Sequence, residues 1–424
     1  MIKQLAILSL LLFIIGCSQS DKEQSQKVRD NSYRPSGFHA FINHGKDNTP
    51  VSLVQIDTSF HLFYTTGVNE WGHLVSSNLV DWAPSTSFPL NHSGHGEVIW
   101  DENNLTGLNA PWNILISDGD ELNLSYSADG LEWTTYDNNP VLKTEGTISS
   151  SWNSALEQWI LTIVDDSELS FFTSENLTNW SKGSTVQLDT EVSKAVLINK
   201  SPNWILLTQG ESIAYQTGSF DGQMFVSQNN QTGNLGISAS GFTVSNSETE
   251  SLLVLGSKVG SQFPTFTTPL SINLIKDKLT LFPASHIQNE IVGKRRAKLS
   301  KLYSDGPSWF KIAIDQEFEE LEIVVSDDSS DLRMSWNKSS NELTLSGTAF
   351  AKENASNPLM LPDIALSNLQ IDLLIDHTTI DLFINNGTYA TSIFIQPNTF
   401  LSKVEVFLDG EKYDAKGVLY DIGI

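Results

Sequence analysis

The 424-residue sequence has almost no cysteine, since Cys17 is its single one. A lone thiol this close to the N-terminus leaves the rest of the chain without a disulfide, so the folded part depends on packing for its stability. Basic residues are also few, with 25 Lys and Arg against 50 Asp and Glu and a formal net charge of −25. Such an acidic surface repels phosphate backbones and gives no electrostatic reason to expect a nucleic-acid partner. No spacing of His, Asp and Glu is typical of a metal site, and we expect neither a metal nor another cofactor.

The N-terminus has the pattern of a targeting segment. A short basic start precedes an apolar run over residues 5–15, which is too short to span a bilayer as a mature helix. The run ends in Ile14-Ile15-Gly16-Cys17, which resembles a bacterial lipobox, where the cysteine becomes the lipidated first residue of the mature protein. We expect a signal peptide at residues 1–17, a lipid anchor on Cys17 and a place in the bacterial cell envelope, at the outer membrane or cell surface. The alternative is an ordinary signal peptide with an incidental cysteine.

Residues 18–32 are polar and have no apolar period, which predicts a flexible tether between the lipid and the folded part. Beyond the tether, one sequence word occurs three times, at Ser76–Trp82, Ser127–Trp133 and Ser174–Trp180. Each copy follows a short apolar and aromatic strand, and helical periodicity is almost absent. Four short strands in a period of about 50 residues are typical of propeller blades. The pattern predicts an all-β fold with a β-propeller over residues 33–290, in which the recurrent tryptophans are core residues.

The pattern changes after about residue 290. Segments in which apolar and polar residues alternate, as expected of strands, occur from residue 310 to the C-terminus, for example at 369–375 and 379–384. Asn385-Asn386-Gly387 is a signal for a tight hairpin turn. The alternation predicts a second domain at residues 291–424, an antiparallel β-sandwich.

Several further words occur in the order and form seen in glycoside hydrolase family 32, which includes invertases, levanases and inulinases. They are, in chain order, Tyr33-Arg34-Pro35 with Phe38-His39, His61–Tyr64, Trp71-Gly72-His73 with Ser76–Trp82, Asp101–Gly107, Ser127–Val141, Gly218–Gly222 and Ile375–Phe383. The resemblance covers nearly the whole mature chain. It implies a five-bladed propeller followed by a C-terminal β-sandwich, and fructan or a related glycan as the ligand. We expect a monomer.

The family's chemistry needs a nucleophilic aspartate and an acid/base glutamate on either side of the scissile bond. Counting back from His61, the family word N-D-P-N-G falls on residues 48–52, so Thr49 stands in the place of the nucleophile. A threonine hydroxyl without an activating base cannot replace a carboxylate in this step. The family word R-D-P falls near residues 148–153, which contain neither Arg nor Asp. The word with the acid/base glutamate resembles Glu191-Val192-Ser193, and only its glutamate is retained.

Three carboxylates are therefore catalytic candidates. Glu191 is the candidate acid/base. Asp47 lies two positions before Thr49, and a shift of two residues preserves the face of a strand, although a solvated turn residue is the alternative. Glu97 takes the place of a serine in the family's pocket-lining F-S-G-S-A strand, and as a second carboxylate it is the other partner for Glu191. The substrate-binding candidates are Asn48, Thr49, Trp71, His95 and Glu97, with blade packing as the alternative for Trp71.

These observations favour an envelope lipoprotein that handles fructan or another carbohydrate as a degenerate, glycan-binding protein. One alternative is an active β-fructosidase on levan, inulin or sucrose that uses Glu191 with Asp47 or Glu97. The other is a scaffold or interaction lipoprotein without a sugar site, because propellers support many functions. Two facing carboxylates about 5–5.5 Å apart would favour the enzyme.

Overall fold

The structure is a computed structural model that describes residues 37–40, 49–67, 70–85, 95–188, 190–228, 233–234, 239–246, 250–257, 265–292, 297–298, 302–304, 306–350, 359–361, 368–395 and 400–421. The predicted signal peptide, Cys17 and the predicted tether lie outside these residues. Asp47 and Asn48 also lie outside them.

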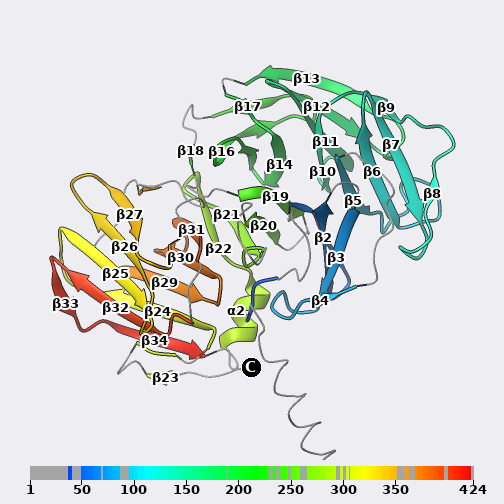
Figure 1. The fold of residues 1–424 in the computed structure, drawn as a ribbon. Helices are drawn as coiled ribbons and strands as arrows, with labels where there is room; N and C mark the ends of the chain where they lie inside the picture. Colours follow the sequence, from blue (N-terminus) through cyan, green and yellow to red (C-terminus); the bar gives the residue numbers. More distant parts are fainter. Residues whose placement is uncertain are drawn as a thin grey trace, which may run out of the picture. The chain divides into compact units, whose positions relative to one another are not determined.

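Strands make up nearly all of the regular structure (Figure 1). The described residues form strands β1 to β34 and one helix, α2 (Ser285–Val292). The prediction of an all-β fold is confirmed. None of the described helical structure is long and apolar enough to cross a bilayer.

Five sheets follow one another along the chain, each built from four consecutive antiparallel strands. In two of the sheets an extra short strand pairs with the third strand. The sheets are β1 (Pro50–Ile56), β2 (Ser59–Gly67), β3 (Glu70–Ser76) and β4 (Ala83–Pro84); β5 (His95–Trp100), β6 (Trp112–Asp118), β7 (Glu121–Ser127) and β8 (Thr134–Thr135), with β9 (Leu142–Lys143); β10 (Thr147–Asn153), β11 (Gln158–Asp165), β12 (Glu168–Ser174) and β13 (Ser181–Gln187); β14 (Lys194–Lys200), β15 (Asn203–Gln209), β16 (Ile213–Phe220) and β17 (Phe225–Ser227), with β18 (Gly233–Asn234); and β19 (Ala239–Asn246), β20 (Ser251–Ser257), β21 (Leu270–Ile275) and β22 (Lys278–Pro283).

The repeated sequence word forms the turn after the third strand of the first three sheets. In the first copy, the Asn78 side-chain oxygen accepts the backbone N–H groups of Val80 and Asp81, at 3.0 and 2.8 Å. Leu79 between them is left-handed, with φ of 64°. The residues in the equivalent places are Asp129 and Gly130 in the second copy and Asn176 and Leu177 in the third. The word therefore recurs because the same side-chain-capped turn recurs.

The first strands of these sheets, β1, β5, β10, β14 and β19, contact one another at corresponding heights. The N–H of Val98 in β5 donates to the Ser52 hydroxyl in β1 at 2.8 Å, and the Ser151 hydroxyl in β10 donates to the Leu197 carbonyl in β14 at 3.1 Å. All four residues lie near the middle of their strands. The first strands thus form a ring, and β5, β10, β14 and β19 surround a common centre in Figure 1.

Two six-stranded sheets follow. One has the order β23 (Ala297–Lys298), β34 (Lys416–Asp421), β24 (Ser308–Ile314), β29 (Leu369–Ile375), β30 (Thr379–Ile384) and β31 (Tyr389–Phe394); the other has the order β28 (Leu359–Met360), β27 (Glu342–Ser346), β26 (Asp331–Asn337), β25 (Glu320–Ser326), β32 (Lys403–Leu408) and β33 (Glu411–Tyr413). Both contribute to one apolar cluster, with Phe310 and Ile371 from the first sheet and Ile323 and Val404 from the second. The predicted turn at residues 385–387 joins β30 to β31, which confirms this hairpin.

A buried polar network joins the segment before β1 to the first six-stranded sheet. His39 is 4% exposed, and its Nδ1 and Nε2 lie 2.9 Å from Asp376 and 3.0 Å from Asp381. The backbone N–H groups of Gly37 and Phe38 also donate to Asp376, at 2.6 and 3.0 Å. Burial alone lowers the pKa of His39, but the two aspartates outweigh burial and raise it to about 9. This imidazole is therefore a buried cation held by two anions.

Candidate functional site

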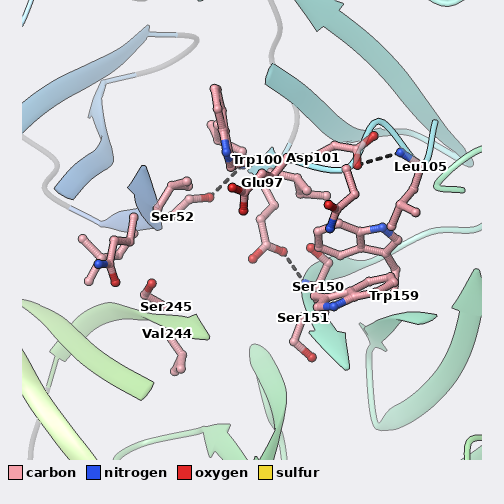
Figure 2. Close-up of a pocket in the computed structure, with 18 of the residues that line it drawn as sticks. Ser52, Glu97, Trp100, Asp101, Leu105, Ser150, Ser151, Trp159, Val244 and Ser245 are labelled. Carbon is pink, nitrogen blue, oxygen red and sulfur yellow. Dashed lines mark hydrogen bonds between the residues drawn. The ribbon is translucent and has the colours of Figure 1, made fainter. Parts of the chain in front are cut away.

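A cavity of about 420 Å³ lies inside the ring of first strands (Figure 2). We call it the carboxyl-end cavity because its walls come from the later residues of β1, β5, β10 and β19 and from the segments that follow. Its lining residues are Ser52, Leu53, Val54, Gln55, Asp57, Glu97, Val98, Ile99, Trp100, Asp101, Glu102, Asn103, Leu105, Ser150, Ser151, Trp152, Trp159, Val244 and Ser245.

Glu97 lies at the centre of this site. Figure 2 shows its side chain extending between Ser52 and Ser245 on one side and Ser150 on the other. The side chain comes from β5 and is 7% exposed, and one carboxyl oxygen accepts the backbone N–H of Ser150 in β10. Burial raises the pKa of Glu97 to about 7, although the Ser150 N–H and the positive charge of Lys194 favour the ionised form.

Among the described residues, the charged group that acts on Glu97 is the cation Lys194. Lys194 is the first residue of β14, and its Nζ lies 5.6 Å from the centroid of the Phe242 ring in β19. Burial lowers the pKa of Lys194, and the negative charge of Glu97 opposes this effect. Each group therefore limits the electrostatic cost of burying the other.

The other carboxylates in the lining have different environments. The two oxygens of Asp101 accept the backbone N–H groups of Leu105 and Thr106 at 2.9 Å each, so Asp101 holds the turn after β5. Asp57 and Glu102 are exposed. Glu97 is therefore the buried carboxylate in the cavity that is not used to hold a local turn.

Thr49, which replaces the nucleophile, lies immediately before β1 and is half-buried. Its carbonyl accepts the N–H of Thr65 at 3.0 Å, and its own N–H donates to the Thr65 hydroxyl at 3.3 Å. A Cβ built on Gly241 of β19 would lie 2.4 Å from the Thr49 methyl group. The side chain is thus packed closely against the neighbouring first strand.

Glu191, the predicted acid/base, is not among the residues that line the carboxyl-end cavity. Glu191 is exposed and precedes β14, whereas Lys194 opens that strand and acts on Glu97. The motif match placed the glutamate three residues before the strand starts. His95 is exposed at the first residue of β5, outside the cavity lining.

The structure places Trp71 in the packing between sheets. Trp71 is 7% exposed and belongs to an apolar cluster with Phe63 and Val98. A Cβ on Gly96 would lie 2.7 Å from its ring. This environment favours the packing role over the predicted sugar-stacking role, because the surrounding residues cover the indole. The tryptophans that border the cavity are Trp100, Trp152 and Trp159, which the sequence analysis did not select.

Lys194 was also missed. A sequence signal existed, because Lys194 immediately precedes the apolar run Ala195–Ile198, as expected of a polar residue at a strand entrance. Within the described residues, no three or more His, Cys, Asp or Glu side chains are grouped so that they could hold a metal ion.

The chain is similar to a family model and to known proteins. Residues 39–232 match the model of the glycosyl hydrolases family 32 N-terminal domain. A levanbiose-producing levanase of Bacillus subtilis is 26% identical over 262 residues, which are 52% of this chain and 51% of that protein. A levanase of the same organism is 26% identical over 271 residues, which are 53% of this chain and 40% of the levanase. The chain thus matches about half or less of the length of these relatives.

Solved structures show the same fold over a greater length. A β-fructofuranosidase from Schwanniomyces occidentalis complexed with fructosyl-erythritol has a TM-score of 0.73 and 18% identity, with 91% of this chain and 96% of that chain covered. An exo-inulinase from Aspergillus awamori has a TM-score of 0.75 and 15% identity, with 92% of this chain and 98% of that chain covered. The resemblance indicated by the sequence motifs is confirmed, because residues 39–232 match the family 32 N-terminal domain and both solved structures share the fold of this chain.

Proposed function

We propose that this protein is a glycan-binding member of the fructan-handling proteins that has lost the family's hydrolytic mechanism. The observation that carries this proposal is the partner of Glu97. A retaining glycosidase needs two carboxyl groups about 5–5.5 Å apart, whereas the charge acting on Glu97 comes from Lys194. Thr49 at the nucleophile position supports the same conclusion, because its neutral hydroxyl cannot replace the nucleophilic carboxylate.

The proposed ligand class follows from the relatives. The names levanase, exo-inulinase and β-fructofuranosidase describe proteins that act on fructose-containing glycans. We infer that this chain has a binding site for such glycans. We also infer that the five sheets of the ring are five propeller blades and that the two six-stranded sheets, which share one apolar cluster, form the predicted β-sandwich.

Incubation with sucrose, inulin and levan tests this function. We expect saturable binding by calorimetry and no release of fructose above a blank without protein. Release of fructose that Glu97→Gln or Glu191→Gln abolishes would contradict the proposal and support the hydrolase. Glu211→Gln, at an exposed glutamate before β16, is the matched control for loss of an acidic side chain. A protein that neither binds these glycans nor releases fructose from them would support the scaffold alternative.

We further propose that the protein is anchored to the bacterial envelope through a lipid on Cys17. The support is the lipobox-like sequence at residues 14–17. In cells fed a labelled fatty acid, the wild-type protein is expected to carry the label and to sediment with membranes. Cys17→Ser is expected to lose the label, because no other cysteine is present. Sedimentation and labelling that are unchanged in this variant would disprove the anchor.

A further inference from the structure

The carboxyl-end cavity and the Thr49 position lie toward opposite ends of the ring of first strands. The cavity lining begins at the third residue of β1 and the third residue of β5, and includes only the fourth to sixth residues of β10. In β19 it includes the sixth and seventh residues. Because one cavity is lined by the later parts of all four strands, these strands run in the same direction around it. Thr49 precedes β1, so it stands at the end where the strands begin.

Indole rings and small hydroxyl side chains both line the cavity. Trp100 and Trp152 are half-buried, and the Trp152 ring lies 5.1 Å from that of Trp159, centroid to centroid. Indoles combine a large apolar face with a polar edge. The C–H faces of a sugar ring pack on such surfaces, while Ser52 and Ser245 lie within reach of hydroxyl groups. A volume of about 420 Å³ falls within the range of small-ligand pockets and suits an oligosaccharide end of one or two units.

The charges around the cavity select an uncharged ligand. The described lining includes carboxylates and no Lys, Arg or His. A sugar hydroxyl donates readily to the Glu97 carboxylate, whereas a phosphate or another anion is repelled by the exposed carboxylates of Asp57 and Glu102. The site is therefore suited to neutral saccharides and unsuited to phosphorylated ones.

We propose that the glycan binds in the carboxyl-end cavity, against Trp152 and Trp100 and with Glu97 at its floor, and not at the Thr49 end of the ring. This inference rests on the proposed glycan-binding function. It assigns that function to a surface made by the ends of β1, β5, β10 and β19.

Calorimetric titration with sucrose and with levan oligosaccharides tests the assignment. Trp152→Ala is expected to weaken binding at least tenfold, and Trp152→Phe, which keeps an aromatic ring, is expected to weaken it less. Trp180→Ala is the matched control, because Trp180 belongs to the same sheet region, is half-buried and does not line the cavity. Thermal melts of all variants separate loss of binding from loss of folding. Sucrose 6-phosphate is expected to bind at least tenfold more weakly than sucrose.

The outcomes distinguish the two proposals. A wild-type protein that binds no glycan would overturn the proposed function and, with it, this inference. A wild-type protein that binds glycan with an affinity unchanged by Trp152→Ala would overturn this inference alone. Loss of binding in Thr49→Val with retention in Trp152→Ala would place the ligand at the opposite end of the ring. Equal affinity for sucrose and its phosphate would contradict the charge argument.

Discussion

His39→Gln is expected to lower the free energy of unfolding by about 3–5 kcal/mol, because it leaves two buried aspartates without their cation. Asp376 and Asp381 are both 1% exposed or less, so water cannot replace the lost positive charge. Urea unfolding followed by circular dichroism measures the change. His95→Gln, at an exposed histidine, is the control and is expected to change the stability by less than about 0.5 kcal/mol. If His39→Gln also lowers the free energy of unfolding by less than about 0.5 kcal/mol, the network of His39, Asp376 and Asp381 does not depend on a charged imidazole.

The same network predicts how stability depends on pH. The pKa of His39 is raised to about 9 in the folded protein, so its contribution is complete below the unfolded value of about 6.5 and is lost as the pH rises through 9. Hydrogen bonds from His377 and His39, together with the His39 charge, outweigh desolvation and hold the pKa of Asp376 well below its ordinary value. The Asp376 contribution is therefore complete above about pH 4 and is lost on acidification.

The difference between wild type and His39→Gln is thus expected to be largest between about pH 4 and pH 6.5 and to fall as the pH approaches 9. Unfolding curves at a series of pH values measure this difference. A difference that is constant from pH 5 to pH 10 would contradict the assignment of the charge to His39.

Gly387→Ala is expected to destabilise the protein by about 3 kcal/mol or more, from two additive causes. Gly387 has φ of 84°, in the left-handed region that an alanine adopts at a cost. A Cβ there would also lie 2.0 Å from the carbonyl oxygen of Leu281 in β22, whose N–H donates to the Gly387 carbonyl at 3.0 Å. The hairpin turn of β30 and β31 therefore cannot keep its place against β22 with a side chain at residue 387.

Gly410→Ala separates the two causes. Gly410 has a similar φ of 81°, but a Cβ there would meet no atom within 4 Å. Its substitution is expected to cost about 1 kcal/mol, from backbone strain alone. Thermal melts of both variants give the comparison. Equal losses would show that the close approach to Leu281 does not contribute to stability.

Local features were predictable because short-range physics sets them. The alternation in residues 369–375 and 379–384 predicted β29 and β30, and the Asn-Asn-Gly sequence predicted the turn that joins β30 to β31. The three copies of the repeated word predicted equivalent turns, because an Asn or Asp side chain caps its own turn wherever it occurs. The family resemblance was predictable from the order of such words.

The site was less predictable, because its parts are distant in sequence. Glu191 was selected by similarity to a family word, but β14 starts at Lys194, and the charge of Lys194 is the one that acts on Glu97. Trp71 was selected as an aromatic residue within a family motif, and it is covered by the packing of Gly96 against its ring. No local pattern distinguishes a tryptophan that borders a cavity from one that fills the space between sheets.

The strands, the turns and the exchange of an aspartate for Thr49 were predictable, since each depends on residues close together in the chain. The effect of Lys194 on Glu97 and the position of Trp100, Trp152 and Trp159 around one cavity were not, because they depend on how the sheets assemble. The reason is that Glu97 and Trp100 come from the second sheet, Trp152 and Trp159 from the third and Lys194 from the fourth, and closure of the ring of first strands sets the heights at which their side chains meet.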